Sequence, residues 1–115
     1  MSLDIYLYID VDVGADEPRR IELYGANVTH NLNKMAGEAG LYEVLWRPDE
    51  HGYKIAVDMI DVIEKGLKLL KEWPDKFKKF NPENGWGNYE EFVSWVEDYL
   101  NACKKNPKAY VIVSG

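Results

Sequence analysis

Residues 3–13 read LDIYLYIDVDV, and this stretch decides the fold because aliphatic residues alternate with polar or aromatic ones. Alternation with a period of two is typical of a β-strand that buries one face. The side chains predicted to face the core are Leu3, Ile5, Leu7, Ile9, Val11 and Val13. The side chains predicted for the opposite face are Tyr6, Tyr8, Asp10 and Asp12. We expect that second face to stay open, where it could bind a partner.

Two further strands are predicted around the first. Residues 14–18, GADEP, indicate a turn, and residues 20–24, RIELY, a returning strand with Ile21 and Leu23 directed inward. The final apolar run, residues 109–113, predicts a strand that pairs with the first. A hairpin joined by a C-terminal strand follows from this order.

The middle of the chain predicts helices. Thr29 is a suitable N-cap for a short helix that ends near Gly40, a further apolar turn runs to Arg47-Pro48, and a long helix is expected from about Tyr53 to Trp73. Asn88 resembles the start of a capping box for another helix. The apolar face predicted for that helix contains Phe92, Val96, Tyr99 and Cys103.

These elements predict an α+β fold in the order β-β-α-α-α-β. The expected sheet is small, antiparallel or mixed, with about three strands packed on three or more helices. The 115 residues suit one globular domain spanning residues 1–115, because two halves of this length would each bury too little surface.

Composition limits the partners and the compartment. The net charge of −6 argues against a general nucleic-acid binder, because phosphate contacts need a basic surface. No segment approaches the ~18 apolar residues of a membrane span. Cys103 is the only cysteine, which suits a buried apolar role and a cytoplasmic setting. The acidic stretches at residues 1–18 and 83–98 are read as solvated faces, or alternatively as a surface that docks a protein.

Residues 24–33, YGANVTHNLN, form the best candidate site, because polar side chains gather where a strand is expected to become a helix. Asn27, Thr29, His30 and Asn31 could hold a small polar or anionic ligand there. The structural alternative is that Thr29 caps the helix, that Asn27 or Asn31 satisfies turn backbone, and that His30 forms a hydrogen bond inside the fold. Capping alone leaves His30 unexplained, and no phosphate-loop motif follows Gly25.

Aromatic residues add to this candidate site. Trp86 lies between two glycines, and an indole in such a loop commonly closes the core or alternatively covers a ligand. Trp46, which precedes Arg47-Pro48, presents the same choice. If Trp86, Trp46 and Arg47 face the His30 region, they would form a stacking and anion-binding set suited to a nucleotide-like ligand.

Metal and catalytic motifs are weak. The candidate metal ligands are spread over the chain without a recognisable spacing, namely His30, His51, Asp10, Asp12, Asp58 and Asp61. No serine lies in a nucleophile motif. Because neither a metal-ligand spacing nor a nucleophile motif is present, we expect no cofactor, no metal and no catalytic residue. His30 as a general base is the enzymatic alternative.

Three blocks of sequence resemble small uncharacterised proteins of bacteriophages and bacteria. They are residues 27–32 with the Thr-His-Asn-Leu block, residues 45–48, and residues 81–89 with the Asn-Gly-Trp-Gly loop. The resemblance implies a context in which such proteins bind host proteins or nucleotide signals used in defence. It carries no catalytic role to any residue here.

The leading hypothesis is a non-enzymatic binding protein, a phage accessory or counter-defence factor by its resemblance. Its predicted site contains Asn27, Thr29, His30, Asn31, Arg47 and Trp86. The second hypothesis is an acidic module that binds a host protein or forms a homodimer. The third is a small hydrolase or transferase.

Overall fold

A three-stranded antiparallel sheet forms one layer of this α+β protein, which is described for residues 2–115 by a computed structural model. Its strands are β1 (Ser2–Val11), β2 (Arg19–Thr29) and β3 (Tyr110–Ser114). The order across the sheet is β2-β1-β3, so β1 is central and pairs with both neighbours. This confirms both the predicted hairpin and the predicted pairing of the last strand with the first.

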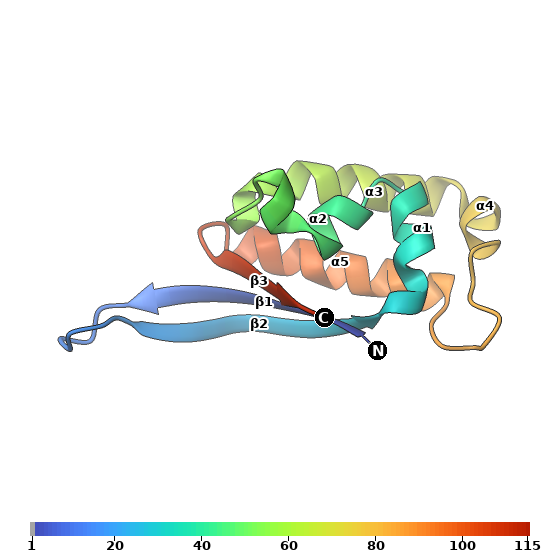
Figure 1. Cartoon of the computed structure of the whole chain (residues 1–115). Helices are drawn as coiled ribbons and strands as arrows, with labels where there is room; N and C mark the ends of the chain where they lie inside the picture. Colours follow the sequence, from blue (N-terminus) through green and yellow to red (C-terminus); the bar gives the residue numbers. More distant parts are fainter. Residues whose placement is uncertain (1) are drawn as a thin grey trace.

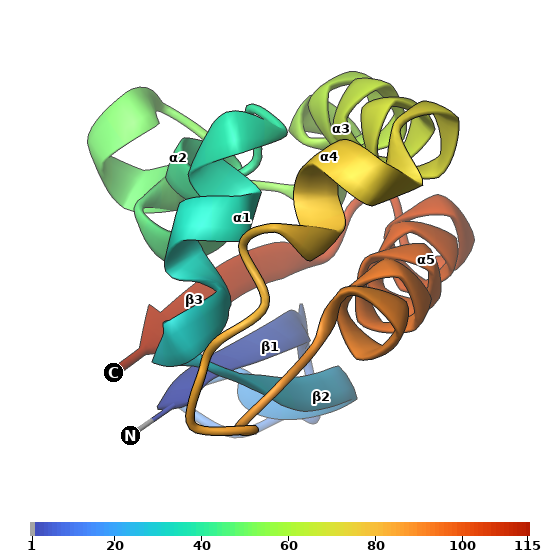
Figure 2. The ribbon, with the colours of Figure 1, turned by 90° about the vertical axis from the view of Figure 1, so that its right-hand side faces the viewer.

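The helices form a second layer on one side of the sheet (Figures 1 and 2). The α-helices are α1 (Asn33–Glu38), α2 (Tyr42–Trp46), α3 (Ile60–Glu72), α4 (Pro74–Lys78) and α5 (Tyr89–Lys105). Short 3-10 turns are η1 (His30–Leu32), η2 (Pro48–His51) and η3 (Ala56–Asp58). The predicted α+β class and the order of strands and helices are therefore correct.

The core lies between β1 and the two long helices. Leu3, Ile5 and Leu7 are at most 2% exposed, because alternate positions of β1 point toward the helical layer. Apolar side chains from α3 and α5 meet them there, and those fully buried include Ile63, Leu70, Phe92, Val96, Tyr99 and Cys103. The apolar face predicted for the last helix is confirmed by this burial.

Helix ends follow local capping chemistry. The Thr29 Oγ1 atom accepts a bond from the Asn31 backbone N–H at 3.3 Å, and Asn88 Oδ1 accepts one from the Glu91 N–H at 2.8 Å. Arg47, which precedes Pro48, leaves the helical region at φ −135° and ψ 45°. Both predicted caps and the predicted end of α2 are confirmed.

The far end of the β1–β2 hairpin projects beyond the helices as an arm (Figure 1). Ile21 and Leu23, predicted to face inward, are 37% and 38% exposed because no helix covers this part of the sheet. Val13 was predicted to continue the buried face, but it lies beyond β1 and is 52% exposed. The arm contributes to the elongated shape of the molecule, with extents of 53 × 27 × 23 Å.

The sheet face opposite the helices is aromatic, as predicted from the alternation. The ring centroid of Tyr8 lies 5.8 Å from that of Tyr6 and 5.9 Å from that of Tyr110. The Arg20 guanidinium lies 5.1 Å from the Tyr8 ring centroid, and the Tyr110 hydroxyl donates to Asp10 at 2.8 Å. These contacts fix the aromatic rings against one another across the three strands.

Two predicted boundaries are wrong. The strand expected to stop at Tyr24 continues to Thr29, because residues 25–29 pair with residues 2–6 of β1. The long helix begins at Ile60 rather than near Tyr53, because Ile55 bridges to Tyr110 at the start of β3. In both places pairing with a distant segment overrides the local pattern.

Trp73 also differs from its prediction. The three- and four-residue spacing of apolar residues in the long helix predicts that Trp73 shares its buried face, but Trp73 is 58% exposed. It caps the end of α3 with φ −128° and ψ 58°, immediately before Pro74. The proline forces its neighbour out of the helical region, which turns the indole away from the core.

Candidate functional site

The predicted polar cluster is divided by the backbone that carries it. In β2 the side chains alternate, so buried Val28 faces the helices while Asn27 and Thr29 lie on the other face, opposite Asp4 and Ser2 of β1. The chain then turns into η1, a 3-10 segment of three residues. The candidate residues consequently line two different pockets on either side of this junction.

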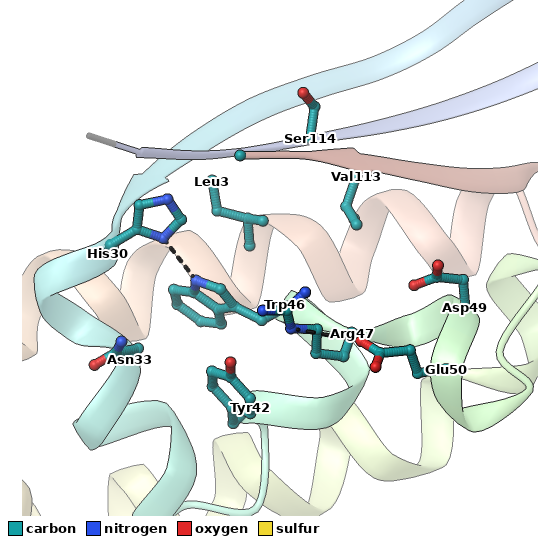
Figure 3. A pocket seen from close by; sticks show the side chains of 11 residues that line it. Leu3, His30, Asn33, Tyr42, Trp46, Arg47, Asp49, Glu50, Val113 and Ser114 are labelled. Atoms are coloured by element: carbon teal, nitrogen blue, oxygen red, sulfur yellow. Dashed lines mark hydrogen bonds and ion pairs between the residues drawn. The ribbon is translucent and has the colours of Figure 1, made fainter.

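His30 lines the first pocket, where it contacts Trp46 of α2 (Figure 3). The Trp46 Nε1–H donates to His30 Nδ1 at a distance of 2.9 Å. An indole nitrogen only donates, so Nδ1 must be the unprotonated acceptor and the proton of the neutral ring lies on Nε2. In this tautomer His30 can donate a further hydrogen bond from Nε2.

Charged and aromatic side chains complete the first pocket, which has a volume of about 320 Å³. The Tyr42 and Trp46 rings stack with centroids 5.7 Å apart, and Trp46 is only 7% exposed. The Arg47 Nε atom lies 3.5 Å from Glu50 Oε2. The neighbouring Tyr42 hydroxyl and then Glu50 raise the pKa of Arg47, which keeps its guanidinium charged.

The electrostatics of the first pocket disfavour an anion. Its one cation, Arg47, is already paired with Glu50, and Asp49 adds a second carboxylate to the lining. The Trp46 Nε1–H and His30 Nδ1 form a hydrogen bond with each other. His30 therefore has the structural role that the sequence offered as the alternative to ligand binding. Arg47 and Trp46 line this pocket together with His30, an arrangement that the sequence left open, but Trp86 does not line it.

The remaining predicted residues meet in a second pocket of about 560 Å³. Its lining residues are Ser2, Asn27, Thr29, Asn31, Asn84 and Trp86. None of them carries a formal charge, and each offers a hydroxyl, an amide or an indole N–H. The second pocket therefore brings together four of the six predicted site residues in an uncharged, hydrogen-bonding environment.

Trp86 is 70% exposed, so its indole does not close the core as such loop residues commonly do. Gly85 and Gly87 on either side adopt φ values of 77° and 91°, which L side chains rarely adopt. A Cβ on Gly87 would lie 2.7 Å from Thr29 Cγ2, so the loop is seated directly on the end of β2. The two glycines thus place the indole beside the amides of the second pocket.

Asn84 joins this loop to η1. Its Oδ1 atom accepts from the Trp86 backbone N–H at 3.0 Å and from Asn31 Nδ2 at 3.5 Å. The Asn84 side-chain nitrogen and the Asn31 side-chain oxygen take no part in these two hydrogen bonds. Asn84 and Ser2 were not singled out in the sequence, although the Asn-Gly-Trp-Gly-Asn composition already marked the loop.

A third pocket of about 250 Å³ adjoins the second and shares Asn27, Thr29 and Trp86 with it. Trp95 of α5 lines this third pocket, and its buried Nε1–H has no hydrogen-bond partner within residues 2–115. A buried donor of this kind is uncommon in proteins. The indole of Trp86 is therefore flanked by hollows on two sides.

The other candidate chemistries receive no support from the arrangement of residues 2–115. They contain no group of three or more His, Cys, Asp or Glu side chains that could hold a metal ion. Burial raises the pKa of the Cys103 thiol to about 12, which makes it a poor nucleophile at neutral pH. No helix described for this chain is both long enough and apolar enough to cross a membrane.

Comparison with known proteins finds no matching family model, no similar curated protein and no similar solved structure. The likeness to small phage and bacterial proteins stays a prediction from the three sequence blocks. Function must therefore be argued from the pockets themselves.

Proposed function

We propose that this protein is a non-enzymatic binding protein that holds a small, uncharged, polyhydroxylated ligand of the saccharide type in the second pocket. The observation that carries the proposal is the 70% exposed indole of Trp86, held beside three asparagine side chains and Thr29. An exposed tryptophan on a constrained loop has no role in burying the core. Its surroundings instead match the two kinds of surface that a sugar presents.

The chemistry of a sugar ring fits both parts of the second pocket. The C–H face of a pyranose is apolar and packs against an aromatic plane, while its hydroxyls donate and accept hydrogen bonds around the rim. Asn27, Asn31 and Asn84 carry both amide donors and carbonyl acceptors, which can pair with neighbouring hydroxyls. A few well-placed polar groups beside an aromatic surface are typical of ligand sites.

A charged ligand suits this pocket less well. Phosphate recognition relies on Arg, Lys or helix N-termini, and the lining of the second pocket has no cationic side chain. The Thr29 hydroxyl and the Asn31 N–H are already joined in the cap. We therefore narrow the expected ligand from polar or anionic to polar and uncharged.

A second, weaker proposal than saccharide binding is that the acidic stretch at residues 83–98 docks a protein. Glu90 lies 3.6 Å from the Lys78 amine, and Glu97 pairs with Lys71. These contacts neutralise part of the acidic stretch locally. A partner that recognises negative charge would compete with lysines already in place.

The test is a panel of neutral mono- and disaccharides, with nucleoside monophosphates as the charged comparison, followed by nitrogen-15 NMR of the indole N–H signals. We expect a saccharide to shift the Trp86 signal and to raise the thermal midpoint, since a ligand at ~100 times its Kd stabilises by nearly 3 kcal/mol. Trp86→Ala and Asn31→Ala should each remove the rise in the thermal midpoint that the saccharide causes.

Trp73→Ala is the matched control, because Trp73 is also an exposed indole, at 58%, but lines none of the three pockets described above. It should bind like the unaltered protein, as should Arg47→Ala. Absence of binding across the saccharide panel would overturn the proposal. Binding of a nucleotide that is lost in Arg47→Ala and kept in Trp86→Ala would move the site to the first pocket.

A further inference from the structure

The outer edge of β2 is the longest unpaired strand edge in residues 2–115. β2 has 11 residues and pairs only with β1, so its other side presents free backbone N–H and C=O groups. The opposite edge of the sheet is formed by β3, which has five residues. β3 is partly covered at its start, where the Val111 N–H donates to the Lys54 carbonyl at 3.0 Å.

The outer half of β2 is neither short nor covered, and its protection is limited to charged side chains and one bulge. Natural edges are shortened, covered, charged, bulged, or interrupted by proline and lysine, because an open edge pairs with other chains. Residues 19–23 read RRIEL, contain neither proline nor lysine, and are all exposed. Ile21 and Leu23 place apolar side chains on this uncovered segment at 37% and 38% exposure. A bulge after Glu22 is the one irregularity in its pairing with β1.

The charge pattern of this segment is complementary to itself. In antiparallel pairing about a two-fold axis at Ile21, Ile21 faces Ile21 of the second copy, and Arg20 faces Glu22 in both directions. An axis at Glu22 would bring two carboxylates together, and an axis at Arg20 would bring two guanidinium groups together. Only the register centred on Ile21 pairs opposite charges around an apolar centre.

We propose that this chain forms a symmetric homodimer in which residues 19–23 of β2 pair antiparallel with the same residues of a second copy. The two three-stranded sheets then form one six-stranded sheet.

The projecting arm makes room for this contact. Tyr24 stacks on Tyr99 of α5 with ring centroids 6.0 Å apart, so the helical layer begins to cover β2 at Tyr24. With the axis at Ile21, each arm lies beside the other arm, and the two helical layers lie at opposite ends of the joined sheet. The second pocket begins further along β2, at Asn27, and stays open in both copies.

The short length of the pairing predicts a reversible dimer. Five residues on each side bury less than the roughly 1,200 Å² of a standard interface, which places the complex in the weak class. Sedimentation from about 5 µM to about 500 µM brackets the dissociation constants expected for such an interface. We expect the monomer to dominate at the low end and the dimer at the high end.

Charge exchange tests the register. Arg20→Glu and Glu22→Arg each place like charges opposite one another twice, and each should raise the dissociation constant by about tenfold. The double variant Arg20→Glu with Glu22→Arg restores opposite charges and should return to within about threefold of the unaltered chain. Circular dichroism of each variant separates lost pairing from lost folding.

Cross-linking provides a second, independent readout. Ile21→Cys should form an intermolecular disulfide under mild oxidation, because the two copies of residue 21 face each other. Val13→Cys is the control, since Val13 is an exposed apolar residue outside β2. A monomer at every concentration, equal cross-linking of the two variants, or no recovery in the charge-exchanged double variant would each overturn the proposal.

Discussion

The two halves of β1 have the same alternating sequence and different surroundings. Leu3, Ile5 and Leu7 are buried under α3 and α5, whereas Val11 is only partly buried and Val13 is 52% exposed, where the hairpin extends beyond the helices (Figure 1). The period of two therefore indicates a strand along its whole length. Whether the aliphatic face becomes core depends on how far the second layer of the protein extends.

The largest expected effect separates these halves directly. Leu7→Ala removes a fully buried side chain and should lower the free energy of unfolding by about 2–5 kcal/mol, whereas Ile21→Ala on the arm should cost less than about 1 kcal/mol. Urea denaturation at low protein concentration measures both values. Equal losses of unfolding free energy in the two variants would show that the arm is covered in solution. Amide hydrogen exchange that is slower in residues 19–21 than in residues 4–7 would show the same.

The packing of β2 on α5, at the boundary between the two halves, can be tested by measuring stability as a function of pH. Tyr24 meets Tyr99 there, and burial raises the pKa of nearby Cys103 from 9.0 to about 12. Between these two values the unfolded chain loses the thiol proton while the folded chain keeps it. The unfolded state then binds fewer protons, so stability should fall by up to about 1.4 kcal/mol per pH unit for this group.

Cys103→Ala isolates that contribution from the tyrosines. Burial also raises the pKa of Tyr24 and Tyr99, but their ordinary value of 10.0 places their contribution at higher pH. The slope of stability between about pH 9 and about pH 10 should therefore flatten in Cys103→Ala. An unchanged slope would mean that the thiol is accessible to water in the folded protein.

The smallest effect concerns the helix that covers the inner half. Asn88 Oδ1 accepts from the Glu91 N–H at the start of α5, and Asn88→Ala should cost about 1 kcal/mol. Asn88→Asp keeps the acceptor and should stay close to the unaltered stability. Chemical denaturation of both variants makes the comparison, and a loss as large in Asn88→Asp would show that capping is not the reason.

Much of the fold is predictable from the sequence because local chemistry and tertiary contacts agree. The alternation at residues 3–11, the Thr29 and Asn88 caps and the apolar face of α5 all have the predicted structure. Gly25 is different, because a glycine directly after a predicted strand suggests a turn. In the fold it lies opposite Tyr6, where a Cβ would come within 3.1 Å of the tyrosine ring. No local pattern reveals that cross-strand contact.

The candidate site is predictable only in part for a similar reason. Four of the six predicted residues lie within residues 27–31, but strand alternation and the 3-10 turn direct them into two pockets. The expectation that Trp86 closes the core is wrong, because the positive φ angles of its two glycines turn the indole outward. The bond from Trp46 to His30 joins residues 16 apart, and the sequence carries no signal for it.

The glycines at 85 and 87 separate the shape of the loop from the residue that it displays. Their left-handed backbone and the contact of Gly87 with Thr29 hold the loop, while the Trp86 side chain contributes little to that support. Position 86 can therefore change without altering its frame. Substitution there offers a route to new ligand preferences at little cost to folding, which is the arrangement that selection or a designer would use to diversify a binding protein.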